Sequence, residues 1–96
     1  MITNYNKLEN KGNEVLLFYI PDHCAGCKRV KKMLEDKNLQ NWTIHLVDSE
    51  SGEHKDLIEK YDVKMAPTLV VFKDGEPLKT IRGLKEFIEN RELFVD

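Results

Sequence analysis

The residues with the clearest capacity for chemistry are the two cysteines of the chain, Cys24 and Cys27, which are separated by two residues. A disulfide between them would close a loop of four residues and stabilise the fold by only about 2 kcal/mol, against nearly 5 kcal/mol for a loop of about 100 residues. The pair is therefore poorly placed as a structural staple. The spacing alone leaves three interpretations open: two neighbouring buried thiols, half of a metal site, and a dithiol that is reversibly oxidised.

The sequence around the pair predicts a buried strand followed by a helix. Residues 15–20 form a continuous apolar run that ends at Pro21, which is typical of a strand buried on both faces. From residue 25 onward the period changes, because Cys27, Val30 and Leu34 fall on one face of an amphipathic helix. The cysteine pair thus lies where the strand ends and the helix begins.

This position distinguishes the two sulfurs. Cys24 lies at the start of the helix, where free N–H groups and the positive end of the helix dipole favour a thiolate. Lowering a thiol pKa from about 8.5 to about 7 takes only ~2 kcal/mol and makes about half of the thiol ionised at neutral pH. Cys27 lies on the apolar face, so we expect it to be more buried and to keep its proton for longer.

The remaining patterns predict an α/β fold. Strand, helix and strand in succession imply a parallel pair with a right-handed crossover, whereas Asp74-Gly75 predicts a hairpin between antiparallel strands. We therefore expect a mixed four-stranded sheet, in the order βαβ and then αββα, flanked by helices and preceded by a short N-terminal extension. The elements beyond the first strand and helix are a short helix at 4–10, strands at 42–47, 68–72 and 78–81, and helices at 54–61 and 84–88.

Length, composition and charge limit the classes of function. With 96 residues, 41% hydrophobic and 33% charged, we expect a single globular domain spanning residues 1–96. A formal charge of −2 argues against a nucleic-acid partner. The longest apolar run has six residues, far fewer than the ~20 that cross a bilayer, and no basic and apolar leader is evident. We therefore expect a cytoplasmic protein without a membrane segment.

The motifs together resemble the thioredoxin superfamily. The resemblance rests on a strand, the sequence Cys24-Ala25-Gly26-Cys27, a helix, and then Met65-Ala66-Pro67-Thr68 leading into an apolar strand and a glycine hairpin. It implies the thioredoxin fold and a thiol–disulfide oxidoreductase with Cys24 as nucleophile and Cys27 as resolving cysteine. It also implies that Pro67 is cis and faces the pair. The residues that it implies for substrate binding are His23, Met65, Ala66, Pro67 and Gly83.

The sequence departs from thioredoxins proper at three places. His23 replaces a tryptophan and Ala25-Gly26 replaces Gly-Pro, so the reduction potential of thioredoxins cannot be assigned to this chain. A protonated His23 would favour the Cys24 thiolate, whereas Asp22 would oppose it. Phe18 occupies the place of a buried aspartate, so no carboxylate is expected behind Cys27. The neighbourhood of the family's partner lysine holds Ile44 or His45, and we expect His45 to be satisfied by a hydrogen bond.

From these observations we expect a reductant of protein disulfides that has no cofactor and no metal, acts as a monomer, and is regenerated by a flavoprotein reductase or by a thiol pool. A glutaredoxin-like reductase coupled to a thiol pool is one alternative. Others are a zinc or copper module using Cys24, Cys27 and His23, and an interaction module with an idle pair. The basic residues of the first helix could steer acidic partners, although a solvated surface is the simpler interpretation; these are Lys28, Arg29, Lys31 and Lys32.

Overall fold

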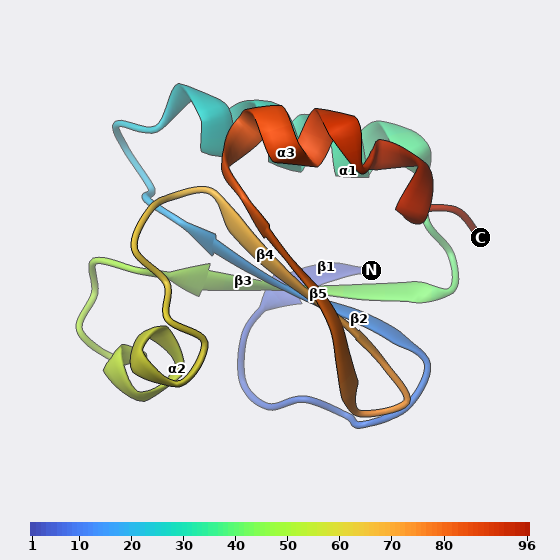
Figure 1. Ribbon diagram of the computed structural model, residues 1–96, viewed down its shortest axis with the longest axis horizontal. Coiled ribbons are helices and arrows are strands. Elements are labelled where there is room, and N and C mark those ends of the chain that lie inside the picture. The colour runs from blue at the N-terminus through green and yellow to red at the C-terminus, as the bar shows by residue number, and fades with distance from the viewer.

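The computed structural model describes all 96 residues as a five-stranded sheet with helices on both faces (Figure 1). The strand order is β1-β3-β2-β4-β5, with β1 and β2 parallel to β3 and with β4 antiparallel to both β2 and β5. The elements are β1 (Ile2–Asn4), β2 (Asn13–Tyr19), α1 (Ala25–Lys37), β3 (Trp42–Asp48), α2 (Lys55–Lys60), β4 (Thr68–Lys73), β5 (Glu76–Arg82), α3 (Gly83–Glu89) and a 3₁₀ turn, η1 (Arg91–Leu93). None of the helices has the length and apolar character that a membrane span requires.

The N-terminal region differs from the prediction. The helix expected at residues 4–10 is absent, and Ile2–Asn4 instead form β1, so the sheet has five strands rather than four. Residues 2–4 pair with residues 44–46 of β3, some forty positions along the chain. The segment has weak helical periodicity, and strand pairing satisfies its backbone groups where a short isolated helix would be marginal.

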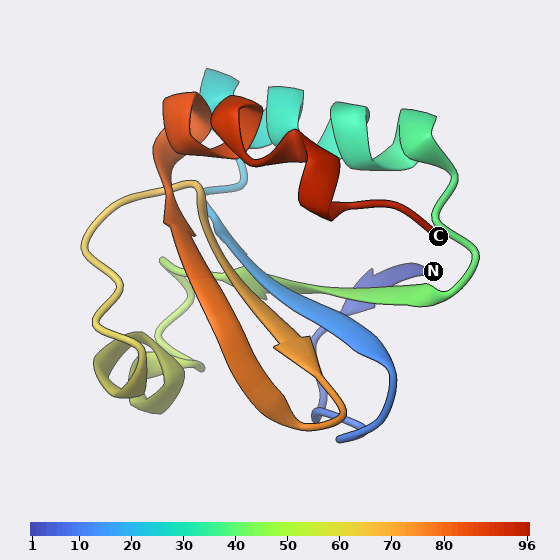
Figure 2. The same ribbon diagram turned by 45° about the vertical axis from the view of Figure 1, so that its right-hand side comes forward.

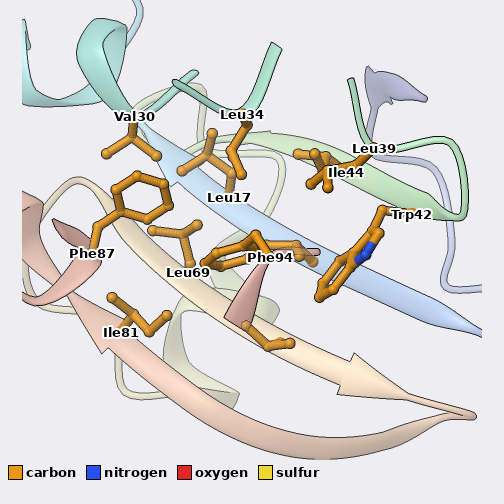
Figure 3. Close-up of a cluster of buried hydrophobic side chains, with 12 residues drawn as sticks. Leu17, Val30, Leu34, Leu39, Trp42, Ile44, Leu69, Ile81, Phe87 and Phe94 are labelled. Atoms are coloured by element: carbon orange, nitrogen blue, oxygen red, sulfur yellow. The ribbon is translucent and has the colours of Figure 1, made fainter. Parts of the chain in front are cut away.

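The apolar run of β2 fills two cores because its side chains alternate between the faces of the sheet. Val15 and Leu17 point toward α1 and α3, whereas Leu16 and Phe18 point toward α2. Figure 2 shows α1 and α3 side by side over one face, with α2 below the other. The larger core, drawn in Figure 3, brings side chains of β2, β3, β4 and β5 against those of α1, α3 and the C-terminal segment. The prediction of a strand buried on both faces is confirmed.

Helix α1 buries the predicted stripe of Cys27, Val30 and Leu34, ends at Lys37 and is capped by Asn38, whose backbone is left-handed with φ 50°. The hairpin between β4 and β5 turns at Asp74 and Gly75, both with positive φ as a tight hairpin requires. At the end of β2, the amide and the hydroxyl of Ser49 both donate to the Tyr19 carbonyl, at 2.9 and 2.8 Å. These contacts fix the strand end from which the cysteine loop departs.

Candidate active site

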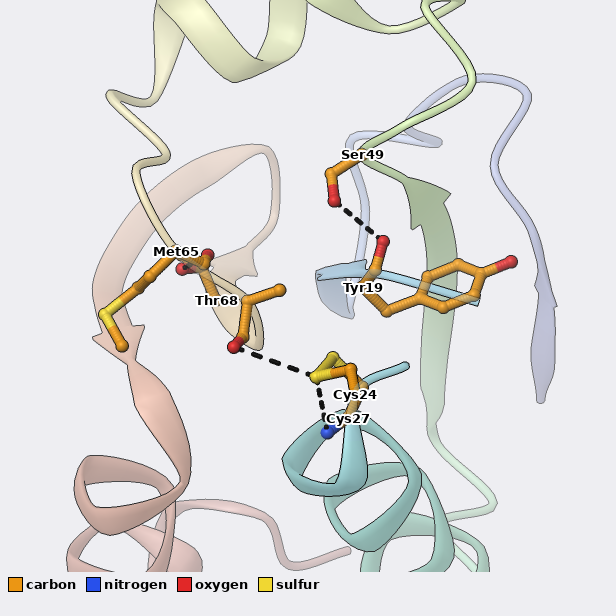
Figure 4. The surroundings of a disulfide bond; sticks show 7 residues. Tyr19, Cys24, Cys27, Ser49, Met65 and Thr68 are labelled. Carbon is orange, nitrogen blue, oxygen red and sulfur yellow. Dashed lines mark hydrogen bonds between the residues drawn. A yellow bond between two sulfur atoms is a disulfide. The ribbon is translucent and has the colours of Figure 1, made fainter. Parts of the chain in front are cut away.

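Cys24 and Cys27 are joined by a disulfide at the N-terminus of α1, with their Cα atoms 5.2 Å apart (Figure 4). Cys24 is the N-cap of the helix, and its sulfur accepts a hydrogen bond of 3.1 Å from the Cys27 amide. This donor and the helix dipole would both favour negative charge on the Cys24 sulfur once the pair is reduced. Cys24 is partly exposed, whereas Cys27 is only 3% exposed. The geometry therefore offers one reachable sulfur and one sheltered sulfur.

The segment opposite the disulfide is held by hydrogen bonds from two other elements. The peptide bond between Ala66 and Pro67 is cis, the geometry expected from the sequence, and the Ala66 carbonyl oxygen lies 3.8 Å from the Cys24 sulfur. The Thr68 hydroxyl donates to the Met65 carbonyl at 2.7 Å, and the Gly83 amide donates to the Pro67 carbonyl at 2.8 Å. The start of β4 and the start of α3 thus fix the segment against the cysteine pair.

Gly26 is a site residue that the sequence analysis considered only as part of the dipeptide between the cysteines. A Cβ added there would lie 3.3 Å from the Pro67 Cδ atom and 3.7 Å from the Leu84 Cβ atom. The missing side chain therefore allows the first turn of α1 to approach both Pro67 and α3 closely. The available signal was a glycine in the first turn of a helix that was expected to face a proline.

Met65 and Gly83, both expected to bind substrate, are next to each other. Gly83 has φ +86°, and a Cβ added to it would lie 3.0 Å from the Met65 Cε atom. The methyl end of Met65 therefore lies over Gly83, while the residue as a whole remains 49% exposed. A chain that approached the Gly83 backbone would have to displace this flexible thioether side chain.

The structure shows no polar interaction between His23 and the rest of the site. His23 is exposed, and no hydrogen bond or ion pair joins it to another residue. No group of three or more His, Cys, Asp or Glu residues is arranged to hold a metal ion. Phe18 is fully buried in the apolar cluster on the α2 side, so this position of β2 holds a phenyl ring and no carboxylate.

Glu14 and His45 form a buried pair that no sequence pattern indicated. The Glu14 carboxylate accepts from the amides of Glu9 and Asn10 at 2.8 and 2.9 Å and lies 2.8 Å from the His45 Nε2 atom. Burial would raise the pKa of Glu14, but the Glu9 amide, His45 and the Asn10 amide together outweigh it and lower the pKa below its ordinary value. Glu14 is at the start of β2, whereas the cysteine loop follows its other end. The pair therefore lies outside the site, and His45 has the hydrogen-bond partner expected for it.

Comparisons of the sequence and of the fold with known proteins both identify thioredoxins as relatives. The thioredoxin family model matches residues 2–91. The thioredoxin of Chlamydia trachomatis is 35% identical over 74 residues, covering 75% of this chain and 71% of that protein. The thioredoxin of Chlamydia pneumoniae is 32% identical over 80 residues, with 79% and 76% covered.

Among solved structures, the thioredoxin of Fasciola hepatica superposes with a TM-score of 0.72 at 29% identity, covering 90% of this chain and 82% of that one. A protein from Edwardsiella tarda named Trxlp reaches 0.81 over the full length of both chains, and its 14% identity shows the fold alone. These matches, together with a CxxC disulfide at a helix N-terminus, show that the chain belongs to the thioredoxin family and is a thiol–disulfide oxidoreductase.

Proposed function

We propose that this oxidoreductase reduces protein disulfides, with Cys24 as the attacking thiolate and Cys27 as the resolving thiol. The observation that carries the proposal is the contrast between the two sulfurs. The Cys24 sulfur is partly exposed and accepts the Cys27 amide at the helix N-terminus, whereas Cys27 is 3% exposed. A thiolate is the nucleophile in disulfide exchange, so the more reachable and better stabilised sulfur attacks first.

The reaction then has two exchange steps. The Cys24 thiolate attacks one sulfur of the substrate disulfide, a new bond forms between Cys24 and that sulfur, and the other substrate sulfur leaves as a thiolate. Cys27 next attacks the Cys24 sulfur, which breaks the mixed disulfide and releases the second substrate thiolate. Two electrons pass to the substrate, and the enzyme is left with the Cys24–Cys27 disulfide.

The segment of residues 65–67 provides a docking edge for an extended substrate strand. Its Ala66 carbonyl faces the reacting sulfur, and the Met65 side chain and Gly83 lie beside it. Backbone hydrogen bonds along such an edge give affinity, while neighbouring pockets select side chains. A hollow of about 240 Å³ borders Met65 and Ala66. Its wall combines the apolar residues Ile20, Ile58 and Val63 with the polar residues Ser49, Glu50 and Lys64, which suits a side chain with an apolar body and a polar end. We also propose that His23, which is exposed and precedes Cys24 in the sequence, contacts the substrate.

The oxidised enzyme needs a source of electrons. Each cycle of the proposed reaction passes two electrons to the substrate and ends with the Cys24–Cys27 disulfide, which another reductant must open. We propose that a flavoprotein reductase supplies these electrons, and that a thiol pool is the alternative donor. We further propose that residues 1–96 act as one domain and as a monomer in the cytoplasm, where protein thiols are kept reduced.

Single-cysteine variants test the assignment of roles. Cys27→Ser should accumulate a mixed disulfide with a model protein disulfide such as insulin, because the first step proceeds and the second cannot. Cys24→Ser should form no such adduct above the level of the double-serine variant, since its remaining thiol is buried. Non-reducing electrophoresis and mass spectrometry measure the adduct, and circular dichroism checks that each variant is folded. Equal adduct formation by the two variants contradicts the assignment.

A further inference from the structure

The second step requires a buried thiol to lose its proton. Cys27 is 3% exposed, and no hydrogen bond joins its sulfur to an ionisable side chain. Removal from water disfavours the charged form of a thiol, so Cys27 in this position ionises less readily than a cysteine in solution. The attack on Cys24 therefore needs an exit for the proton and a source of positive potential.

The strand behind Cys27 provides neither. Phe18 is fully buried among apolar side chains on the α2 side of the sheet. The buried carboxylate of β2, Glu14, is held by two amides and His45 near the other end of the strand. A base that receives the Cys27 proton must therefore come from another direction.

A cavity of about 230 Å³ borders Cys27 on the α1 side of the sheet. Its walls come from the end of β2, from Leu46 of β3, and from Cys27, Lys28 and Lys31 of α1. At about 30 Å³ per water molecule, it has room for several waters. The cavity can thus connect the buried thiol with solvent.

The charged residues that line this cavity are all basic. Its ionisable groups are Lys28 and Lys31 from α1 and Tyr19 from β2, while β3 contributes only Leu46. No carboxylate lines it; Asp48, the β3 residue paired with Tyr19, accepts the Glu50 amide instead. Both lysines are exposed at the surface, and the carboxylate of Glu35 lies beside Lys31 in the wall of the adjacent hollow. The two ammonium groups outnumber this carboxylate, so their net potential favours a negative charge on a neighbouring sulfur.

We propose that this cavity is the path by which the Cys27 proton reaches solvent, and that Lys28 and Lys31 stabilise the Cys27 thiolate as it attacks the mixed disulfide. The inference rests on the proposed roles of the two cysteines. The proton passes from the Cys27 sulfur to water, the Cys27–Cys24 bond forms, and the bond from Cys24 to the substrate sulfur breaks. The substrate leaves as a thiolate and takes its proton from solvent, so atoms and electrons balance.

The test follows the two steps separately with one equivalent of 4,4′-dithiodipyridine, a small disulfide without charge at neutral pH. Each step releases one thiopyridone, so a stopped-flow record of the reduced protein gives a first phase for Cys24 and a second phase for Cys27. The variants are Lys28→Gln, Lys31→Gln and the double substitution. Lys32→Gln is the matched control, because Lys32 is on the same helix, is paired with Asp36 and does not line the cavity.

In the double glutamine variant, we expect the second phase to slow about tenfold at pH 7 and its pH midpoint to rise by about one unit. The two single variants should lie between wild type and the double variant, and the Lys28→Arg/Lys31→Arg protein should keep the wild-type profile, since it keeps the charge. Lys32→Gln should match wild type. An unchanged pH midpoint in the double glutamine variant, or loss of the profile in the arginine variant, overturns the proposal.

The same record separates this inference from the proposed function. Cys27→Ser should release its one equivalent of thiopyridone at the rate of the wild-type first phase, whereas Cys24→Ser, whose remaining thiol is buried, should release its equivalent much more slowly. Release by Cys24→Ser at the rate of the wild-type first phase would remove the assigned cysteine roles, whatever the lysine variants do. The expected rates from both cysteine variants together with unshifted lysine variants would remove only the role of the cavity.

Discussion

Gly83 shows at the scale of one residue why the start of α3 needs glycine. Its φ of +86° lies in the region that side chains rarely adopt, and its amide bonds to the Pro67 carbonyl. We expect Gly83→Ala to lower the free energy of unfolding by about 1–2 kcal/mol, because the backbone strain cannot be relieved without breaking that bond. Urea denaturation measures the loss.

A double-mutant cycle with Met65→Ala separates backbone strain from side-chain contact. Met65 lies 3.0 Å from the position of the added Cβ, but its flexible end can move aside. Gly83→Ala should therefore lower the free energy of unfolding by nearly the same amount with and without the Met65 side chain. If Gly83→Ala no longer destabilised the protein in the Met65→Ala background, the contact with Met65, and not the positive φ, would be the reason that glycine is required here.

Some features of the site can be predicted from the sequence and others cannot. The spacing of the cysteine pair can be recognised directly, whereas the cis peptide bond was expected only from the resemblance to the thioredoxin superfamily. The approach of Gly26 to Pro67 joins residues 41 positions apart, and the contact of Met65 with Gly83 joins residues 18 apart. Such contacts depend on how the helices pack on the sheet, which local patterns do not encode. The role of each site residue remains a prediction for the variants above.

Among the elements, patterns were most informative where burial is strong. The continuous run of β2 and the apolar stripe of α1 predicted these elements closely, because each follows its own period. Strand β1 escaped prediction because it has three residues and exists through its pairing with β3. Its existence is a consequence of tertiary structure, and a local propensity argument favoured the wrong element.

The Glu14–His45 pair links β2, β3 and the loop after β1, and it predicts a pH dependence of stability. The pKa of Glu14 is lowered in the folded state, so the unfolded carboxyl binds protons more readily than the folded one. The stability from this group is fully present above the ordinary value of 4.5 and is lost as the pH falls through the lower folded value. Acid should therefore loosen this end of the sheet.

We expect Glu14→Gln to lower the free energy of unfolding at pH 7 by about 1.5–3 kcal/mol, the usual contribution of hydrogen bonds to a charged group. The difference from wild type should shrink as the pH falls from about 5 to about 3, because wild type then loses the same charge. Urea titrations across this range measure it. Glu9→Gln is the control, since only the backbone amide of Glu9 bonds to Glu14. If the difference in unfolding free energy between wild type and Glu14→Gln stayed constant with pH, the lowered pKa of Glu14 would be contradicted.

At the scale of the whole molecule, the redox centre lies apart from what holds the fold together. Two apolar clusters lie on opposite faces of the sheet. One packs α1, α3 and the C-terminal Phe94 against the sheet, and the other packs α2 against it. The disulfide joins residues only three positions apart in the chain, at one end of a helix whose buried face continues to Leu34. The enzyme should therefore keep its fold in both redox states.

The final prediction follows from this separation. Because the disulfide closes a loop of only four residues, reducing it should lower the free energy of unfolding by no more than about 2 kcal/mol. The far-ultraviolet circular dichroism and the urea m value should not change, since the surface buried on folding is the same in both states. Urea titrations with and without dithiothreitol test this, and the Cys24→Ser/Cys27→Ser protein should not respond to the reductant. A loss of helical signal on reduction would mean that the disulfide, rather than the two clusters, fastens α1. The exchange reaction would then be coupled to unfolding of that helix.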